Sequence, residues 1–162
     1  MRVGWFDTAD RVLAAVIALG RWLVLPVSLL LFIQWPLREL VRAYSTQAND
    51  LAQWLFALYV SLAMTCATRE GSHLAADAVA YRYHAATRRW IGKAAALLCI
   101  VPWSLFVLIA GAPLVWRSII QFEAFPETYS SGYFIIKASA WLLALLALLQ
   151  GLLEIGRPAA PR

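Results

Sequence analysis

The segment between residues 69 and 93 carries the side chains whose types and spacing are suited to chemistry. His73 and Asp77 stand four residues apart, which places them one turn from each other on the same face of a helix. Such a pair can ligate a metal ion, the carboxylate can orient the imidazole through a hydrogen bond, or both can meet a neighbouring chain. Two ligands alone are a weak metal signature, so the last two roles are favoured and no metal site is assigned.

The same segment predicts a short amphipathic helix beyond Gly71. On a continuous helix, His73, Asp77, His84 and Arg88 fall within about 60° of one another and form a polar stripe. The two histidines would be about 16 Å apart along that helix, which is too far for them to share a metal ion or a haem.

Polar groups that could perform catalysis or bind an ion are scarce elsewhere. Within the apolar runs we pick out only hydroxyls, at Ser61, Thr65, Ser104 and Ser139, and no Asp, Glu, Lys or His lies in the middle of a run. An ion-coupled transporter normally carries an intramembrane carboxylate or an unwound helix, and an enzyme needs a convergent set of polar side chains. The sequence therefore predicts no catalytic residue, no cofactor and no enzymatic activity.

The elements around these residues are those of a membrane protein. Hydrophobic residues make up 62% of the 162 residues and charged residues 14%, about half the share in soluble domains. Four apolar runs predict an all-α membrane protein with four transmembrane helices, and residues 1–162 form a single domain. The expected spans are residues 21–44, 51–68, 94–116 and 134–156. The spans are joined by a connection at 69–93, which contains the short helix, and by one at 117–133. We expect Asn49 or Asp50 to cap the second span. We expect Cys66 and Cys99 to be reduced residues that pack within the spans.

Residues 1–20 have the period of an amphipathic helix. Apolar or small residues recur on one face and Asp7, Asp10, Arg11 and Arg21 fall on the other. We expect an interfacial arm that turns into the membrane at Arg21, because a single long span would bury this arginine at a cost of about 2.5–3.5 kcal/mol.

The basic residues predict the orientation of the chain. With four spans, both ends lie on the same side as the 69–93 connection, and that side holds ten of the Lys and Arg residues against four on the other. The positive-inside rule therefore places both termini in the cytoplasm. Because these residues lie in the connections, the net charge of +5 does not indicate nucleic-acid binding.

Small residues form stripes on two of the expected spans. One stripe consists of Ala57, Ser61 and Thr65, and the other of Ala140, Ala144, Ala147 and Gly151. Small side chains let helices approach closely, either within this chain or against a partner, and packing within the chain is favoured.

The second span and the pattern Arg69-x-Gly71-x-His73-x-x-x-Asp77 after it resemble the small membrane subunit of TRAP (tripartite ATP-independent periplasmic) transporters, the DctQ-like family. Gln53-Trp54 and the run from Leu148 to Leu152 add to the resemblance, which covers about residues 20–157. Leu74 and Ala76 depart from it, since β-branched residues are usual there, and this implies looser packing of the cytoplasmic helix.

This resemblance implies a place in a larger machine of the bacterial inner membrane. A periplasmic binding protein would deliver an organic acid, and a large membrane subunit would carry the sodium and substrate sites. The present chain would form a stable heterodimer with that subunit, scaffolding and anchoring it among the lipids, with Arg69, Gly71, His73 and Asp77 in a structural or interface role. The binding protein would bind transiently, and Glu123 and Glu127 would either contact it or, as favoured, be solvated loop charges.

Two other functions of small membrane proteins agree less well with the sequence. A membrane anchor of a respiratory complex needs haem-ligating histidines within the spans, and His73 and His84 lie outside them. A small self-assembling exporter usually carries an intramembrane glutamate, and the expected spans have none in their middle.

Overall fold

The computed structural model describes residues 3–40, 45–70 and 84–156. Within these ranges the chain is helical apart from short connections, and its one β-bridge, between Ala124 and Ser131, belongs to no strand. The helices are α1 (Val3–Arg21), α2 (Val24–Leu40), α3 (Thr46–Glu70), α5 (Ala85–Ala95), the π-helix η1 (Ala96–Ile100), α6 (Val101–Ile120) and α7 (Tyr133–Gly156).

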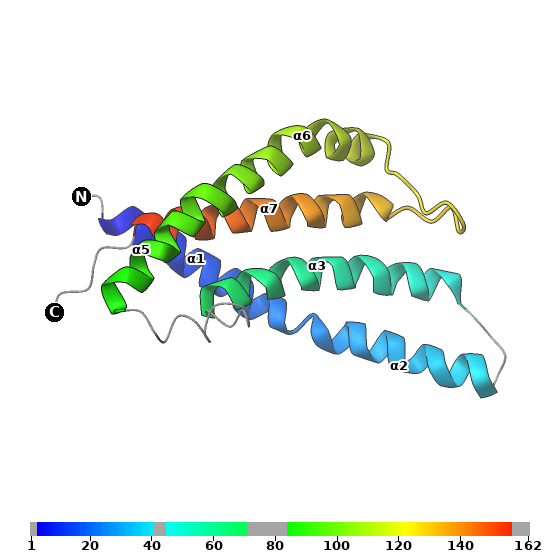
Figure 1. The fold of residues 1–162 in the computed structure, drawn as a ribbon. Helices are drawn as coiled ribbons and strands as arrows, with labels where there is room; N and C mark the ends of the chain where they lie inside the picture. The colour runs from blue at the N-terminus through cyan, green and yellow to red at the C-terminus, as the bar shows by residue number, and fades with distance from the viewer. Residues whose placement is uncertain (1–2, 41–44, 71–83, 157–162) are drawn as a thin grey trace.

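The long helices run up and down beside one another. Helix α7 lies between α6 on one side and α3 on the other, and α2 lies on the far side of α3 (Figure 1). Helix α1 crosses obliquely and contacts both α3 and α7. The start of α1, helix α5 and the end of α7 lie at one end of the bundle, and the loop between α6 and α7 lies at the other (Figure 1).

Four stretches of the described chain are long and apolar enough to cross a membrane. They are Thr8–Pro36, Thr46–Arg69, Trp90–Ile120 and Tyr133–Gly156. The described part of the chain is therefore all-helical with four membrane-spanning candidates, and an even number of crossings agrees with the start of α1 and the end of α7 lying at the same end of the bundle (Figure 1).

A break at residues 22 and 23 separates α1 from α2, and Pro26 accounts for it. Proline has no N–H to donate to the carbonyl of Trp22, and its ring crowds that carbonyl. The Trp22 carbonyl instead accepts a hydrogen bond from the N–H of Leu25 at 3.2 Å, and Leu23 N–H bonds the carbonyl of Gly20 at 3.1 Å. These tighter turns bend the chain at this point.

Helix α1 is packed on the bundle rather than separate from it. Leu13 and Ile17 are buried in a cluster with Leu146 and Leu153 of α7. At Gly20 the backbone comes so close to α3 that an added Cβ would lie 2.3 Å from Cδ1 and 2.9 Å from Cβ of Leu62.

These contacts bear on the expected interfacial arm. An apolar stretch that begins at Thr8 includes most of α1, so the first helix is apolar and the structure does not support an amphipathic arm lying on the membrane surface. The guanidinium of Arg21 donates a hydrogen bond to Sγ of Cys66 on α3 at 3.3 Å, so the charged group has an acceptor on the neighbouring helix.

The π-helix η1 interrupts the helix that runs from Ala85 to Ile120. The N–H of Val101 donates to the carbonyl of Ala96, five residues earlier, where an α-helix would use the residue four earlier. Pro102 follows directly, and its ring displaces the preceding carbonyls. The wider turn accommodates this displacement and faces Gly151 of α7, where an added Cβ would lie 3.3 Å from Ile100 Cγ2.

Helix α3 begins earlier than expected, and its cap is a different residue. The Oγ of Ser45 accepts a hydrogen bond from the N–H of Ala48 at 3.2 Å, so Ser45 is the N-cap. The prediction that Asn49 or Asp50 caps this helix is wrong, because both lie inside it.

Candidate functional site

A buried carboxylate ties α3 to the loop between α6 and α7. Asp50 is 7% exposed, and its Oδ2 accepts hydrogen bonds from the hydroxyls of Thr128 and Ser130, the second at 2.8 Å. Hydrogen bonds to a charged acceptor are stronger than neutral ones, and a buried carboxylate needs them. Asp50 therefore fixes the tip of the loop against the first turns of α3.

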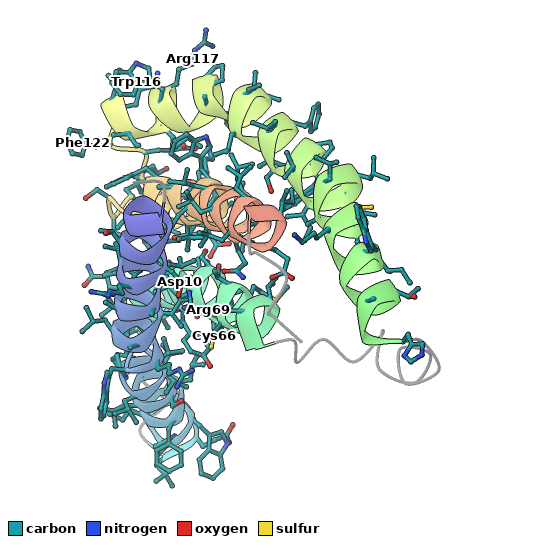
Figure 2. All side chains as sticks on the ribbon, turned by 90° about the vertical axis from the view of Figure 1, so that its left-hand side faces the viewer. Asp10, Cys66, Arg69, Trp116, Arg117 and Phe122 are labelled. Carbon is teal, nitrogen blue, oxygen red and sulfur yellow. The ribbon has the colours of Figure 1, made fainter. Side chains whose placement is uncertain are left out.

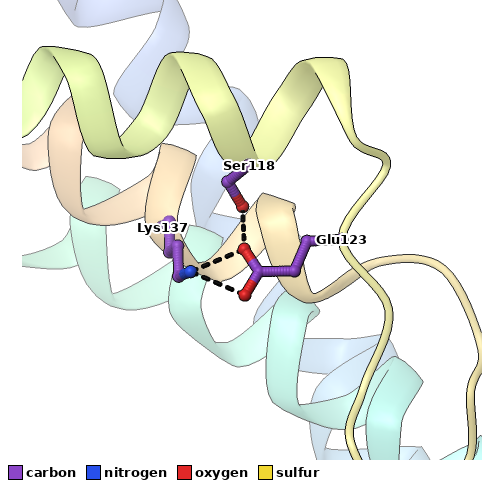
Figure 3. Close-up of polar contacts among 3 residues, drawn as sticks. All are labelled: Ser118, Glu123 and Lys137. Atoms are coloured by element: carbon purple, nitrogen blue, oxygen red, sulfur yellow. Dashed lines mark hydrogen bonds and ion pairs between the residues drawn. The ribbon is translucent and has the colours of Figure 1, made fainter.

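A second carboxylate ties α6 to α7 at the same end of the bundle. The Nζ of Lys137 contacts Glu123 Oε1 at 2.7 Å and Oε2 at 2.5 Å, and the Ser118 hydroxyl donates to Oε2 (Figure 3). The Lys137 ammonium, followed by the Ser118 hydroxyl, holds the pKa of the Glu123 carboxyl below its ordinary value of 4.5. The expectation that Glu123 is a solvated loop charge is thus too simple, because its oxygens are used inside the chain.

The loop itself has a defined shape. Phe125 is 5% exposed and packs edge-on against Tyr133, with ring centroids 5.4 Å apart. Phe125 N–H bonds the Ser130 carbonyl at 2.9 Å, and Tyr129 N–H bonds the Phe125 carbonyl at 2.9 Å. Phe122 and Tyr129 have φ of 45° and 52°, a left-handed conformation that non-glycine residues seldom adopt. The loop is a compact turn held at both flanks by the two carboxylates.

At the opposite end, Arg69 makes an ion pair with α1. Its Nη2 lies 2.6 Å from Asp10 Oδ2, and its Nη1 donates to the Asp10 carbonyl at 3.3 Å (Figure 2). The side chains are 21% and 37% exposed, respectively, so the pair lies at the edge of the bundle. Arg69 thus reaches back to the first helix. The other motif residues, Gly71, His73 and Asp77, lie outside the described residues, as does most of the predicted cytoplasmic helix.

The small residues of α3 face α7. Ser61 and Thr65 are 3% and 2% exposed. The Ser61 hydroxyl lies 2.7 Å from the carbonyl of Ser139 on α7 and 2.9 Å from that of Ala57 on its own helix. A side-chain hydroxyl in contact with the neighbouring backbone requires two helices in close approach.

The small residues of α7 do not all face the same neighbouring helix. Ala144 is fully buried, and Gly151 faces η1. Ala147 lines a cavity next to α3 and α6, and Ala140 is exposed. The stripe therefore serves several different surfaces.

Comparison with known families identifies this architecture. Residues 27–159 match the family described as "Tripartite ATP-independent periplasmic transporters, DctQ component". The chain belongs to this family. No curated protein and no solved structure matches the chain. The family is a transporter component rather than a class of enzyme, and membership implies a large membrane subunit and a binding protein as partners.

The sequence did not predict the burial of two polar side chains of this DctQ component without a hydrogen-bond partner. Gln150 is 3% exposed and its Oε1 has no hydrogen-bond partner. The fully buried Ser104 Oγ has none either. The sequence shows that a glutamine stands in an apolar run but does not show whether its amide is buried. That depends on how α3, α6 and α7 are arranged.

The two cysteines form no disulfide with each other. Cys66 lies in the cluster around Leu13 and Ile17, whereas Cys99 is exposed on η1. Among the described residues, no group of three or more His, Cys, Asp or Glu side chains is placed to hold a metal ion.

Proposed function

We propose that this chain is the small membrane subunit of a sodium-coupled TRAP transporter that imports an organic acid. A periplasmic binding protein would deliver the acid, and the large permease subunit would translocate it. The match of residues 27–159 to the DctQ component carries this proposal. The present chain would scaffold the large subunit and anchor it in the inner membrane.

The outer surface of the bundle supports a scaffolding role. Large apolar side chains lie exposed along α2 and α6, among them Phe32, Trp103, Phe106 and Ile109, at 69%, 52%, 69% and 73% exposure. Such a surface suits lipid or the apolar helices of another subunit. Anchoring and partner binding can thus occupy different sides of the same small bundle.

The proposed orientation places both termini in the cytoplasm. Two carboxylate networks then hold the loop at 121–132 in the periplasm, where its exposed tip, with Glu127 and with Tyr129 at 86% exposure, is available to the binding protein. In this orientation residues 1–20 enter from the cytoplasmic side, and their first turns contact the headgroups.

The motif residues are proposed to be structural. Arg69 connects the end of α3 with Asp10 of α1. His73 and Asp77 would extend such contacts to the cytoplasmic helix or to the large subunit, and Gly71 would permit the tight turn between them. Ala57, Ser61, Thr65, Ala140, Ala144, Ala147 and Gly151 would provide close helix approach, within the chain or to the partner.

Reconstitution tests the proposed function. The chain carries an affinity tag and is expressed with the large subunit and the binding protein. The large subunit should co-purify with it. Proteoliposomes with an inward sodium gradient should take up the organic acid only when all three proteins are present. Uptake by this chain alone, or purification without any large subunit, contradicts the proposal, and a haem absorbance would favour a respiratory anchor instead.

A further inference from the structure

A groove with a cation in its wall lies between α3 and the junction of α1 and α2. Its volume is about 470 Å³. The side chains that line it include Ile17, Arg21 and Val24 from the first two helices and Tyr59, Leu62 and Cys66 from α3. Among its described lining residues, Arg21 alone carries a charge, so one group sets the electrostatic character of the groove.

The guanidinium of Arg21 lies near one end of a membrane-spanning stretch. It donates a hydrogen bond to Cys66 Sγ at 3.3 Å. Cys66 is about 4.5 Å along the helix axis from the end of the stretch Thr46–Arg69. The ion pair of Arg69 with Asp10 lies at the same end of the bundle (Figure 2). This depth is that of the lipid headgroups rather than the bilayer centre.

The groove continues from this charge into an apolar part. Its lining on α3 runs from Ala67 back to Tyr59, about 12 Å along the axis and away from the end of the stretch. Leu62 and Val24 form the walls of that deeper part. A cation at the level of the headgroups, followed by an apolar channel, complements a molecule with an anionic head and a hydrocarbon tail.

We propose that this groove binds an anionic phospholipid, whose phosphate accepts hydrogen bonds from Arg21 and whose acyl chain lies along Leu62 and Val24. A guanidinium has five N–H donors and can serve a phosphate in addition to its partners within the chain. The lipid belongs to the leaflet at the Arg69 end, which is the cytoplasmic one in the proposed orientation, and basic pockets between helices on that side suit such headgroups. The inference requires only that the chain spans a membrane and does not depend on the proposed transport role.

The close packing beside the groove favours a lipid over a helix of another subunit. At Gly20, α1 approaches α3 so closely that an added Cβ would lie 2.3 Å from Leu62 Cδ1. A third helix is about 10 Å across with its side chains, so its entry would require these two helices to separate. A flexible acyl chain can follow the existing surface. A free phosphate ion would pair with Arg21 but leave the apolar walls unused.

Lipid binding to the full chain tests the charge. Phosphatidylglycerol and phosphatidylcholine, both with palmitoyl and oleoyl chains, are titrated into the purified chain, and bound lipid is counted by native mass spectrometry. Phosphatidylglycerol should bind about fivefold more tightly, the equivalent of about 1 kcal/mol. Arg21→Gln should abolish this preference. Arg117→Gln is the matched control, because it removes the same charge at the other end of the bundle and should keep the preference (Figure 2).

A second variant leaves the charge in place and fills the apolar part of the groove. Val24 is 37% exposed, so Val24→Trp has room in the groove without disturbing the buried cluster. Phosphatidylglycerol binding should weaken severalfold. Leu25→Trp is the control, since Leu25 is 57% exposed and does not line the groove, and it should bind this lipid like the unmodified chain.

Cys66 reports where the lipid binds because it lines the groove. In a Cys99→Ala background it is the only cysteine of this chain. Its reaction rate with N-ethylmaleimide should fall severalfold when phosphatidylglycerol is added to phosphatidylcholine nanodiscs, and inorganic phosphate should not change it. Cys99, in a Cys66→Ala background, lies outside this groove and corrects for the lower pH at an anionic membrane surface.

Four results would overturn the proposal. They are equal affinity for the two lipids, a preference that survives in Arg21→Gln or Val24→Trp, protection of Cys66 by inorganic phosphate alone, and protection of Cys66 by the large subunit in phosphatidylcholine alone. The last result would make the groove a subunit interface. If no large subunit co-purifies but phosphatidylglycerol binds as expected, the proposed function fails and the lipid site stands.

Discussion

The two halves of the bundle differ in whether their buried polar groups have hydrogen-bond partners within the chain. At the loop end, Asp50 Oδ2 and both carboxylate oxygens of Glu123 accept hydrogen bonds from hydroxyls or an ammonium of the same chain. In the other half, Gln150 Oε1 is buried with no partner in the described part of the chain. The two carboxylates of the loop end therefore have hydrogen-bond partners within the chain, whereas the Gln150 oxygen in the other half has none among the described residues.

This difference agrees with the work of a small subunit that joins a larger one. In the proposed orientation, a preformed loop would present a fixed surface to the binding protein, and little conformational entropy would be lost on each encounter. A buried acceptor without a partner, such as Gln150 Oε1, lowers the stability of the isolated chain.

The largest effect should follow from the loss of Asp50. Asp50→Ala leaves the Thr128 and Ser130 hydroxyls without their acceptor, and we expect a loss of about 3 kcal/mol in the stability of the loop end. Thermal unfolding in detergent should move to lower temperature, and chymotrypsin should cleave faster after Phe122 and Tyr129, whose backbone is held in a fixed conformation in the intact loop.

Two further variants sharpen this result. Asp50→Asn keeps one acceptor oxygen and should retain part of the stability. Gln53→Ala, on the exposed side of the same helix, should change neither melting nor cleavage. If Asp50→Ala melts and resists cleavage like the unmodified chain, the loop end does not depend on this network.

The second largest effect on stability should come from the packing of α1 against α3, which lies outside the two carboxylate networks. Gly20→Ala places a Cβ within 2.9 Å of Leu62 Cβ, so α1 must shift, and we expect a loss of about 1–2 kcal/mol, measured by thermal unfolding. Gly92→Ala is the matched control, because no atom lies within 4 Å of its added Cβ. There the higher helix propensity of alanine should stabilise the chain by up to about 1 kcal/mol. Equal shifts for the two variants would show that α1 does not approach α3 as described.

The sequence predicted the four membrane-spanning stretches but not which of their faces pack inside the chain. Leu13 and Ile17, on the apolar face expected for residues 1–20, are buried, whereas Val12 on the same face is 58% exposed. Lipid is as apolar as a protein core, so a hydrophobic period does not distinguish a face toward a neighbour from a face toward lipid. The close approach at Gly20 was missed for the same reason.

The polar networks were beyond sequence reasoning because they join distant parts of the chain. Asp50 was expected to cap a helix, a local role, but it meets Thr128 and Ser130, 78 and 80 residues away. Lys137 lies in the second turn of α7, and its partner Glu123 lies 14 residues earlier, at the other side of the loop. Local spacing predicts contacts within a helix, while these pairings depend on how α3, α6 and α7 come together.

The smallest effect should come from titration of Glu123, and it tests whether the loop end depends on charge as well as on hydrogen bonds. Its carboxyl pKa is lowered in the folded chain, chiefly by Lys137. A lowered folded pKa stabilises the chain fully above the ordinary value of 4.5, and this contribution is lost as the pH falls through the lower, folded value. The melting temperature should therefore have a component that falls in acid below about pH 4.5, and Glu123→Gln should lack that component.

Glu127→Gln serves as the control for this titration. Glu127 is an exposed carboxylate of the same loop, so its amide variant removes one charge but leaves the contacts of Glu123 with Lys137 and Ser118 intact. It should keep the acid-dependent component of the unmodified chain. Because Glu123 and Lys137 are partly exposed, with side chains 32% and 24% accessible, raised salt should reduce the component as well. An acid profile that is the same in all three proteins would leave only the hydroxyl network of Asp50 to hold the loop, and the loop end would then rest on one carboxylate rather than two.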